Sequence, residues 1–149
     1  MIEHTHKSKE SLTKACPTFE SESNRQSIIF PYGIPGFEHF TLFYLREVQS
    51  STAFYFLQAQ EEPAIRLILM DAHYLKIKNH FDVWRSELDR LGLANRDDIV
   101  VFVVIKIDKN KQQLTANLKA PIIIFFKEKK GYQVIFEAEE LSVNYQLEE

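Results

Sequence analysis

Three apolar runs dominate the C-terminal half of the chain, and short polar segments separate them. The first, Ile99–Ile105, is nearly all β-branched, the second is Ile122–Phe126, and the third, Tyr132–Phe136, is short and aromatic. Runs of this length bounded by turn-forming residues are typical of buried strands. The connections, Asp108–Lys111 and Lys127–Gly131, are too short for a parallel crossover, which needs about a dozen residues or more. The sequence therefore predicts an antiparallel meander.

Pro121 precedes the second of these runs. Because proline cannot donate to an interior ladder, we expect it at the first position of its strand. The segment Asn117–Pro121 is then a bend, and the strand enters the core from Ile122 onward.

The N-terminal half contains shorter runs of the same kind. Phe19 and Ile28–Phe30 indicate one or two edge strands that end at Pro31. The aromatic runs Phe40–Leu45 and Phe54–Gln58 predict a hairpin, since only a polar segment separates them. The pattern resumes in a further strand at Leu67–Met70.

A single segment, about residues 80–92, has helical periodicity. One apolar stripe contains Phe81, Trp84, Leu88 and Leu91. Asn79 is placed as an N-cap, and Gly92 stands where a left-handed C-terminal residue belongs. The predicted fold class is mainly β: a small antiparallel β-barrel-like domain with this amphipathic helix as a side cover and Trp84 in the core.

Length and composition indicate one domain. A chain of 149 residues with 45% hydrophobic residues can bury a single core without metals or disulfides. Residues 1–16 are polar and aperiodic, so we expect a flexible tail that includes the lone cysteine, Cys16, and a domain over residues 17–149. The sequence has neither a membrane-spanning run nor a signal-peptide pattern, which predicts a soluble, cytoplasmic protein with no membrane partner.

The charge balance argues against nucleic acid as a direct partner. The formal net charge is −3, which is unfavourable for gripping a phosphate backbone. The last residues are strongly acidic, with Glu137, Glu139, Glu140, Glu148 and Glu149 and no basic residue among them. This end is either a solvated, fraying terminus or a negative patch that faces a basic partner.

The sequence offers little material for catalysis. It contains none of the zinc, phosphate-loop, nucleophile-elbow or dinucleotide motifs. His4 and His6 lack a third metal ligand nearby, and His73 and His80 have no nucleophile beside them. Asp71 and His73 lie where a strand gives way to a helix, and at such a position Asp and His are more often capping residues than an acid–base pair. We therefore predict no catalytic residues, no metal and no cofactor.

A loop rich in glycine and proline follows the first strand. In Phe30–Glu38, Gly33, Pro35 and Gly36 fix the backbone, with Pro35-Gly36 suited to the centre of a type II turn. The GxxG spacing lacks the helices and basic residues of an RNA-binding KH loop. Phe37 either plugs the end of the barrel or marks an exposed contact.

Three segments resemble the flagellar assembly factor FliW family. Ile29–Glu38 is similar to its F-x-x-G-I-P-G-F-E segment, Phe54–Gln58 to its aromatic-then-LQ strand, and Thr115–Ile122 to its T-x-N-L-x-A-P-I segment. Gln133–Ile135 matches the final strand, and the order and spacing agree over about residues 18–147. The chain departs from the family at Phe125-Phe126, where an Ile-Asn ending is usual, and at its close, which lacks the usual arginine.

The resemblance implies a non-enzymatic protein that binds two partners alternately. These are flagellin in the cytoplasm and CsrA, the RNA-binding regulator that represses translation of flagellin mRNA. We expect a monomer when unbound. The predicted partner-binding residues are Phe37, Glu38, Asn117, Lys119, Glu137, Glu139 and Glu140, and the predicted structural residues are Gly33, Pro35, Gly36 and Pro121.

Two alternatives remain open. A closed β architecture can bind a small ligand or contain an enzyme active site. A wide polar cavity that contains His73 or His80 would favour such a function, whereas a barrel filled by Phe and Ile side chains would exclude it. The departures from the family pattern also fit a divergent paralogue that binds flagellin only.

Overall fold

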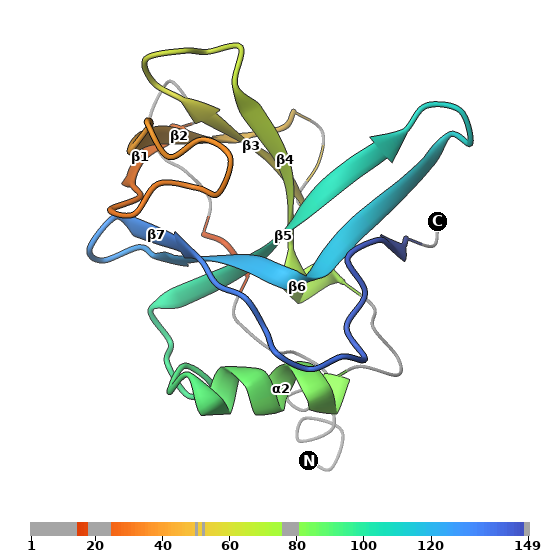
Figure 1. Cartoon of the computed structure of the whole chain (residues 1–149). Coiled ribbons are helices and arrows are strands. Elements are labelled where there is room, and N and C mark those ends of the chain that lie inside the picture. Colours follow the sequence, from red (N-terminus) through yellow and green to blue (C-terminus); the bar gives the residue numbers. More distant parts are fainter. Residues whose placement is uncertain (1–14, 18–24, 50, 52, 76–80, 148–149) are drawn as a thin grey trace.

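The computed structural model describes residues 15–17, 25–49, 51, 53–75 and 81–147. Figure 1 shows a curved sheet with helix α2 beneath it. The elements are β1 (Arg25–Ile29), β2 (Leu42–Glu47), β3 (Phe54–Ala59), β4 (Arg66–Asp71), the 3-10 helix η1 (Ala72–Tyr74), α2 (Phe81–Arg90), β5 (Ile99–Asp108), β6 (Gln113–Phe125), β7 (Lys130–Gln133) and β8 (Tyr145–Gln146). Over the residues that the structure describes, the predicted mainly β fold is confirmed, and α2 is their one α-helix.

The sheet closes on itself. The strand order is β5-β4-β3-β2-β1-β7-β6, β5 pairs with β6 to complete the ring, and β8 attaches to the far part of β6. Both predicted hairpins of the meander are present, and so is the hairpin of β2 and β3. The pairing is antiparallel except for one parallel contact, in which Ile29 of β1 lies opposite Lys130 of β7. This contact joins the N-terminal strands to the C-terminal meander.

Strand β5 is buried on both faces, which explains its unbroken apolar sequence. Val100 and Phe102 point into the barrel, whereas Val101 and Val103 point toward α2. The interior cluster consists of Ile28, Phe30, Ile34, Phe43, Leu45, Tyr55, Leu57, Ala59, Leu69, Val100, Phe102, Ile122 and Ile124. The outer cluster, between the barrel and α2, includes Trp84, Leu88, Ile99, Val101, Val103, Ile105, Leu118, Ile123, Phe136 and Leu141. The two cores thus share strands β5 and β6.

The predicted strand start at Pro121 is wrong. Strand β6 runs without interruption through Asn117–Pro121, and the irregularity is a wide bulge inside it. The register passes from Phe102 opposite Ile122 to Val104 opposite Asn117, so residues 118–121 face Val103 alone. Proline is tolerated in a ladder at a bulge, because no hydrogen-bond donor is needed there.

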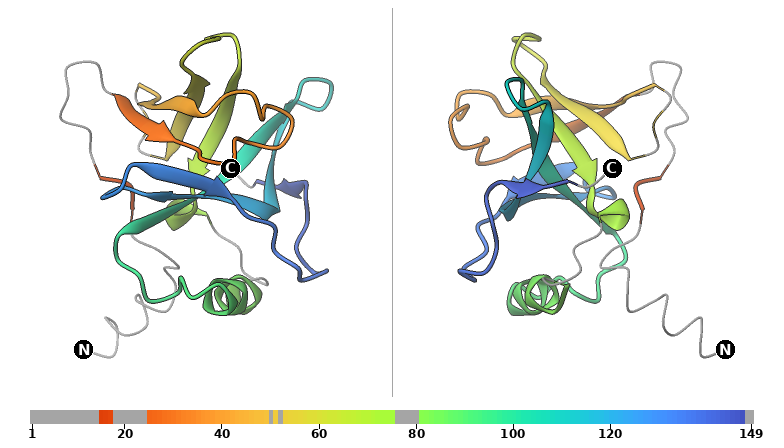
Figure 2. Two further views of the ribbon diagram at one scale, coloured as in Figure 1. Left: turned by 60° about the vertical axis from the view of Figure 1, so that its left-hand side comes forward. Right: turned by 90° about the vertical axis from the view of Figure 1, so that its right-hand side faces the viewer.

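Helix α2 covers the barrel from one side, as Figure 2 shows. Trp84 and Leu88 are fully buried, as predicted, but Leu91 lies beyond the last turn and is 37% exposed. Gly92 has a φ of +76°, and the N–H of Leu93 donates to the carbonyl of Leu88, which confirms the predicted C-terminal cap. The predicted N-cap Asn79 and His80 lie outside the described residues. Within those residues, no helix has the length and apolar character that a membrane span requires.

Two expectations about the ends of the chain need correction. Cys16 is half-buried rather than part of a mobile tail, because its backbone N–H donates to Asp71 Oδ2 at 2.7 Å and its side chain packs against the interior cluster. The C-terminal segment does not fray before Leu147, because the N–H of Leu147 donates to the carbonyl of Leu114 in β6. Phe19, His4, His6, Glu148 and Glu149 lie outside the described residues.

Candidate functional site

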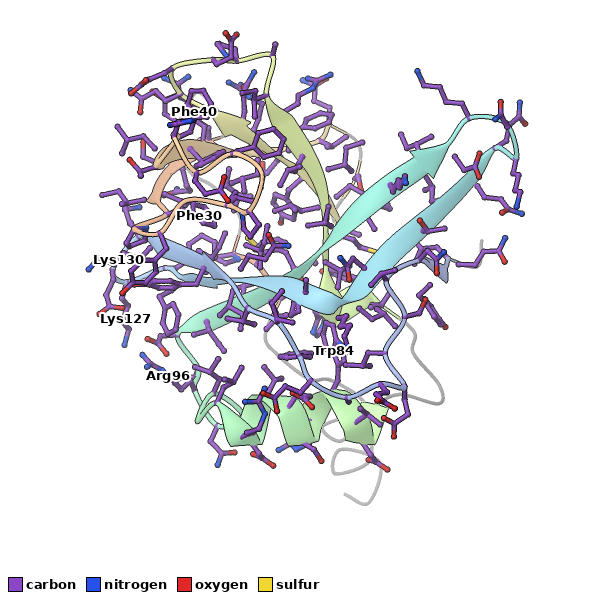
Figure 3. The ribbon with its side chains drawn as sticks, in the orientation of Figure 1. Phe30, Phe40, Trp84, Arg96, Lys127 and Lys130 are labelled. Carbon is purple, nitrogen blue, oxygen red and sulfur yellow. The ribbon has the colours of Figure 1, made fainter. Side chains whose placement is uncertain are left out.

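The residues predicted to bind partners fall into two separate groups. Phe37 and Glu38 belong to the loop that follows β1, beside the interior cluster. The others lie on β6 and on the segment that passes α2. In Figure 3, Phe30 and Phe40 mark the loop end of the molecule, and Trp84 marks the helix end.

The loop has the backbone that its glycines and prolines predict. The N–H of Phe37 donates to the carbonyl of Ile34 at 2.7 Å, and Gly36 has a φ of +93°, as a type II turn requires. Gly33 has a φ of +68°, and a Cβ atom there would lie 2.9 Å from the Cα of Glu38. A side chain at Gly33 would therefore break the loop.

The two loop residues differ in exposure. Phe37 is half-buried and packs against the interior cluster, which supports the interpretation that it plugs the barrel end. Glu38 is exposed, and backbone N–H groups, first its own and then that of Gly36, lower the pKa of its carboxyl. The loop thus presents one fixed negative charge to solvent.

The side chain of Asn117 holds the bulge of β6 in shape. Asn117 Oδ1 accepts hydrogen bonds from the N–H groups of Lys119 at 3.0 Å and Ala120 at 3.2 Å. This turn frees the carbonyl of Leu118, which accepts from the indole Nε1 of the buried Trp84 at 2.8 Å. A bulge in the barrel wall therefore anchors the helix.

The same bulge binds the segment after β7. The carbonyl of Lys119 accepts from the N–H of Phe136 at 2.7 Å, and Lys119 Nζ donates to the carbonyl of Ala138 at 2.9 Å. Asn117 and Lys119, both predicted to contact partners, thus make hydrogen bonds within the chain.

Residues 137–140 form the acidic segment. The carboxylate of Glu87 in α2 binds the backbone of this segment. Its two carboxylate oxygens accept from the N–H groups of Glu137 and Ala138, both at 3.1 Å. Its Oε1 also lies 2.8 Å from Arg90 Nη2. The hydrogen bond from Arg90, followed by those from the two backbone N–H groups, lowers the pKa of the Glu87 carboxyl against the opposing effect of burial.

The acidic segment is fixed in backbone yet exposed in side chain. Glu137, Glu139 and Glu140 are all exposed, and Arg90 Nε lies 4.0 Å from Glu137 Oε1. Of the contacts that organise this segment, the sequence predicted that the Asn117 side chain bonds nearby backbone groups, although it placed them in a bend before the strand and not in a bulge within it. It missed Glu87 and Arg90. Their i, i+3 spacing is a signal for an ion pair on a helix, but it does not indicate a contact with residues 50 positions away.

Asp71 and His73, the described residues that were considered for chemistry, make contacts that shape the end of β4. Asp71 is fully buried and caps η1, since its Oδ1 accepts from the N–H of His73 at 3.0 Å. The ring of His73 stacks edge-on against Tyr74. Within the described residues, no three His, Cys, Asp or Glu side chains are arranged to hold a metal ion. The barrel interior is filled by Phe30, Phe43, Phe102 and the aliphatic side chains of the interior cluster.

Known proteins share this sequence pattern and this fold. The family model described as FliW protein matches residues 12–147. The flagellar assembly factor FliW of Alkaliphilus metalliredigens is 32% identical over 122 residues, which cover 80% of this chain and 75% of that protein. The flagellar assembly factor FliW of Thermotoga neapolitana is 34% identical over 125 residues, which cover 83% and 84%.

A solved structure has the same architecture. It is described as the crystal structure of the flagellar assembly factor FliW, and it matches with a TM-score of 0.61 at 24% identity, covering 92% of this chain and 95% of that one. At this identity the similarity is evidence for the fold, while the family model and the curated relatives are evidence for the family.

Proposed function

The chain belongs to the FliW family of flagellar assembly factors, and we propose that it acts without catalysis, by binding flagellin and the translational regulator CsrA in the cytoplasm. When flagellin is exported, the freed protein takes CsrA from the flagellin mRNA, and translation resumes. Such a switch needs only mass action between two linked binding equilibria.

The observation that carries this proposal is the acidic segment. Three exposed glutamates, Glu137, Glu139 and Glu140, project from a backbone that Glu87 and Lys119 fix in place. A protein that binds RNA needs basic groups for the phosphates. A rigid negative surface attracts such a protein, and it repels the RNA that competes for the same basic groups.

Titration calorimetry with purified flagellin and purified CsrA tests the proposal. We expect heat of binding with each partner. Charge reversal by Glu137→Lys, Glu139→Lys and Glu140→Lys together should weaken CsrA binding more than flagellin binding. The matched control is reversal of three exposed glutamates in turns elsewhere, Glu61, Glu62 and Glu128, which should change CsrA binding much less.

The outcomes separate the alternatives. Heat with flagellin alone identifies a paralogue that binds only flagellin, and the CsrA part of the proposal is then wrong. Absence of heat with both partners removes the proposal altogether. If the triple charge reversal weakens CsrA binding and flagellin binding equally, the acidic segment is not the binding site of CsrA. The filled interior of the barrel supports protein binding over a small-ligand function.

A further inference from the structure

The junction of β1 and β7, where the barrel closes, carries exposed apolar side chains. Ile28 and Phe30 are buried in the interior cluster, so Ile29 between them points outward. Leu42 of β2 is the cross-strand partner of Ile29, and it also points outward because its neighbour Phe43 is buried. Ile29 is 43% exposed and Leu42 is 40% exposed. The register therefore places two aliphatic side chains next to each other on the outside of the barrel.

Two tyrosines continue this apolar surface across the junction. Gly131 of β7 lies against the ring of Phe30 inside the barrel. Its neighbours on the strand, Lys130 and Tyr132, therefore point outward. The ring centre of Tyr132 lies 6.0 Å from that of Tyr32, whose side chain is 83% exposed. Aliphatic and aromatic groups thus meet at one place on the surface, which is typical of an interaction site.

Lysine side chains border these apolar residues at the β6–β7 turn. Lys130 lies directly opposite Ile29 across the junction. Lys127, Lys129 and Lys130 are all exposed, and the one carboxylate among residues 127–130 is that of Glu128. In Figure 3, Lys127 and Lys130 lie near each other at the end of the β6–β7 hairpin. The border of the apolar surface is therefore rich in positive charge.

The carboxylates near this turn are shared with an arginine. Asp98 interacts with Lys127, but both of its oxygens accept hydrogen bonds from the guanidinium of Arg96. Arg96 also interacts with Asp97 and Glu128. Four cations, Arg96 and the three lysines, thus stand against three carboxylates. We call the surface formed by Ile29, Tyr32, Leu42, Lys127, Lys130 and Tyr132 the seam patch.

The paired backbone of the junction favours a helix over an added strand as the occupant of the seam patch. The N–H of Ile29 donates to the carbonyl of Lys129 at 2.9 Å, and Lys129 Nζ donates to Gln26 Oε1 at 2.6 Å. Because this strand edge is occupied, a partner has to bind through side chains. An α-helix satisfies its own backbone hydrogen bonds and presents an apolar stripe. The lysine border favours carboxylates beside that stripe.

A lipid surface or a nucleic acid fits the seam patch less well. Ile29 and Leu42 belong to strands in the wall of the barrel and not to a projecting tip, so they are poorly placed to enter a bilayer. The chain carries a net charge of −3, which repels both anionic lipids and the phosphates of a nucleic acid.

We propose that the seam patch is a docking surface for an amphipathic helix of a partner protein. The apolar stripe of this helix covers Ile29, Leu42 and the two tyrosines, and its carboxylates lie beside Lys127 and Lys130. The seam patch shares no residue with the acidic segment. The proposal therefore stands whether or not flagellin or CsrA binds at that segment.

The test is fluorescence polarisation with a labelled synthetic helix of about 20 residues, which has leucine at the a and d positions of each heptad and glutamate at e and g. One reference peptide has serine in place of the leucines, and another has glutamine in place of the glutamates. We expect the full chain to bind the first peptide about tenfold more tightly than the serine peptide and about fivefold more tightly than the glutamine peptide. Circular dichroism should show that the peptide gains helicity on binding.

The apolar part of the seam patch has a matched control. Ile29→Ser combined with Leu42→Ser should weaken binding about tenfold. Ile107 and Leu114 are the same pair of residue types, also cross-strand partners, and they are 49% and 37% exposed. They lie on the β5–β6 hairpin, on the other side of the barrel in Figure 1. Ile107→Ser combined with Leu114→Ser should leave the affinity within about twofold. The fluorescence of Trp84, the only tryptophan, reports whether each variant is folded.

The charged part has its own control. Lys127→Gln combined with Lys130→Gln should weaken binding about fivefold and reduce its dependence on salt, because exposed charges are screened. Lys109→Gln combined with Lys111→Gln removes two exposed charges from the tip of the β5–β6 hairpin and should leave the affinity within about twofold. Tyr32→Ala removes a ring that is mostly exposed, so this variant should fold and bind about threefold more weakly.

Three results would overturn the proposal. One is equal affinity for the leucine peptide and the serine peptide. Another is the same loss of affinity in the Ile107 and Leu114 control as in the Ile29 and Leu42 variant. The third is tighter binding of phosphatidylglycerol vesicles or of a labelled oligouridylate than of the helix, which would assign the patch to a membrane or to single-stranded nucleic acid. If the serine variant of the patch does not fold, unchanged affinity in Tyr32→Ala contradicts the proposal.

Discussion

The carboxylate of Glu87 accepts a hydrogen bond from the backbone N–H of Glu137 at 3.1 Å, although the two residues lie 50 positions apart. A negative side chain on α2 thus fixes the backbone of a segment that itself carries three exposed negative charges. Because Arg90 also pairs with Glu87, the anchoring carboxylate is compensated and does not repel the segment it holds.

Replacing Glu87 by alanine should destabilise the protein by about 1–3 kcal/mol, because the N–H groups of Glu137 and Ala138 lose their acceptor. Urea unfolding followed by the fluorescence of Trp84 measures the loss. Hydrogen exchange at Glu137 and Ala138 should accelerate more than exchange in β3. Asp89→Ala, at an exposed position of the same helix, should cost less than about 0.5 kcal/mol. Equal losses in the two variants would contradict the anchoring role.

Glu87 should also make the stability depend on pH. Its pKa is lowered in the folded protein, chiefly by the hydrogen bond from Arg90. The folded state therefore binds this proton less readily than the unfolded state does. The stabilisation is present above the ordinary glutamate pKa and is lost as the pH falls through the lower, folded value. Unfolding free energies measured from about pH 6 to about pH 3 should fall more steeply in the parent protein than in Glu87→Gln. Parallel curves would refute this assignment.

Gly131 is the second residue of β7, where the sequence suggested a turn, and it contacts the buried ring of Phe30. A Cβ atom there would lie 2.5 Å from the ring, so Gly131→Ala should force the ring or the strand to move and cost about 1–3 kcal/mol. Thermal unfolding compares it with Gly36→Ala. At Gly36 the space is open and only the φ of +93° opposes a side chain, so the expected cost is about 1 kcal/mol. A Gly131→Ala protein as stable as the parent would show that Phe30 can move aside cheaply.

Cys16 should react slowly with alkylating reagents. Burial raises the pKa of its thiol to about 12, and a hydrogen bond with Tyr55 offsets this only in part. Since the thiolate is the nucleophile, iodoacetamide at pH 8 should modify Cys16 at least about a hundredfold more slowly than a free cysteine. The rate is measured by mass spectrometry of the intact chain.

Asp71 should control that reactivity. Asp71→Ala removes the acceptor of the Cys16 N–H and a negative charge that disfavours the thiolate. The alkylation rate should therefore rise by about tenfold or more. Asp108→Ala, at the end of β5 beside the β5–β6 turn, is the control and should leave the rate unchanged. A rate that does not respond to Asp71 would mean that other contacts hold Cys16 in place.

The sequence by itself determined the local features of this protein. The aromatic runs identified β2 and β3, the β-branched run identified β5, and the stripe through Trp84 and Leu88 identified α2. The turn at Pro35-Gly36 and the cap at Gly92 followed from backbone preferences alone. These features are readable because side-chain periodicity and φ preferences act over a few neighbouring residues.

Only the tertiary structure decided which distant segments meet. The parallel contact of Ile29 with Lys130 closes the barrel, the bulge opposite Val103 admits Pro121 into β6, and Glu87 reaches Glu137. Each contact joins groups that no local pattern links, because their proximity results from the packing of two apolar cores on the two faces of β5 and β6.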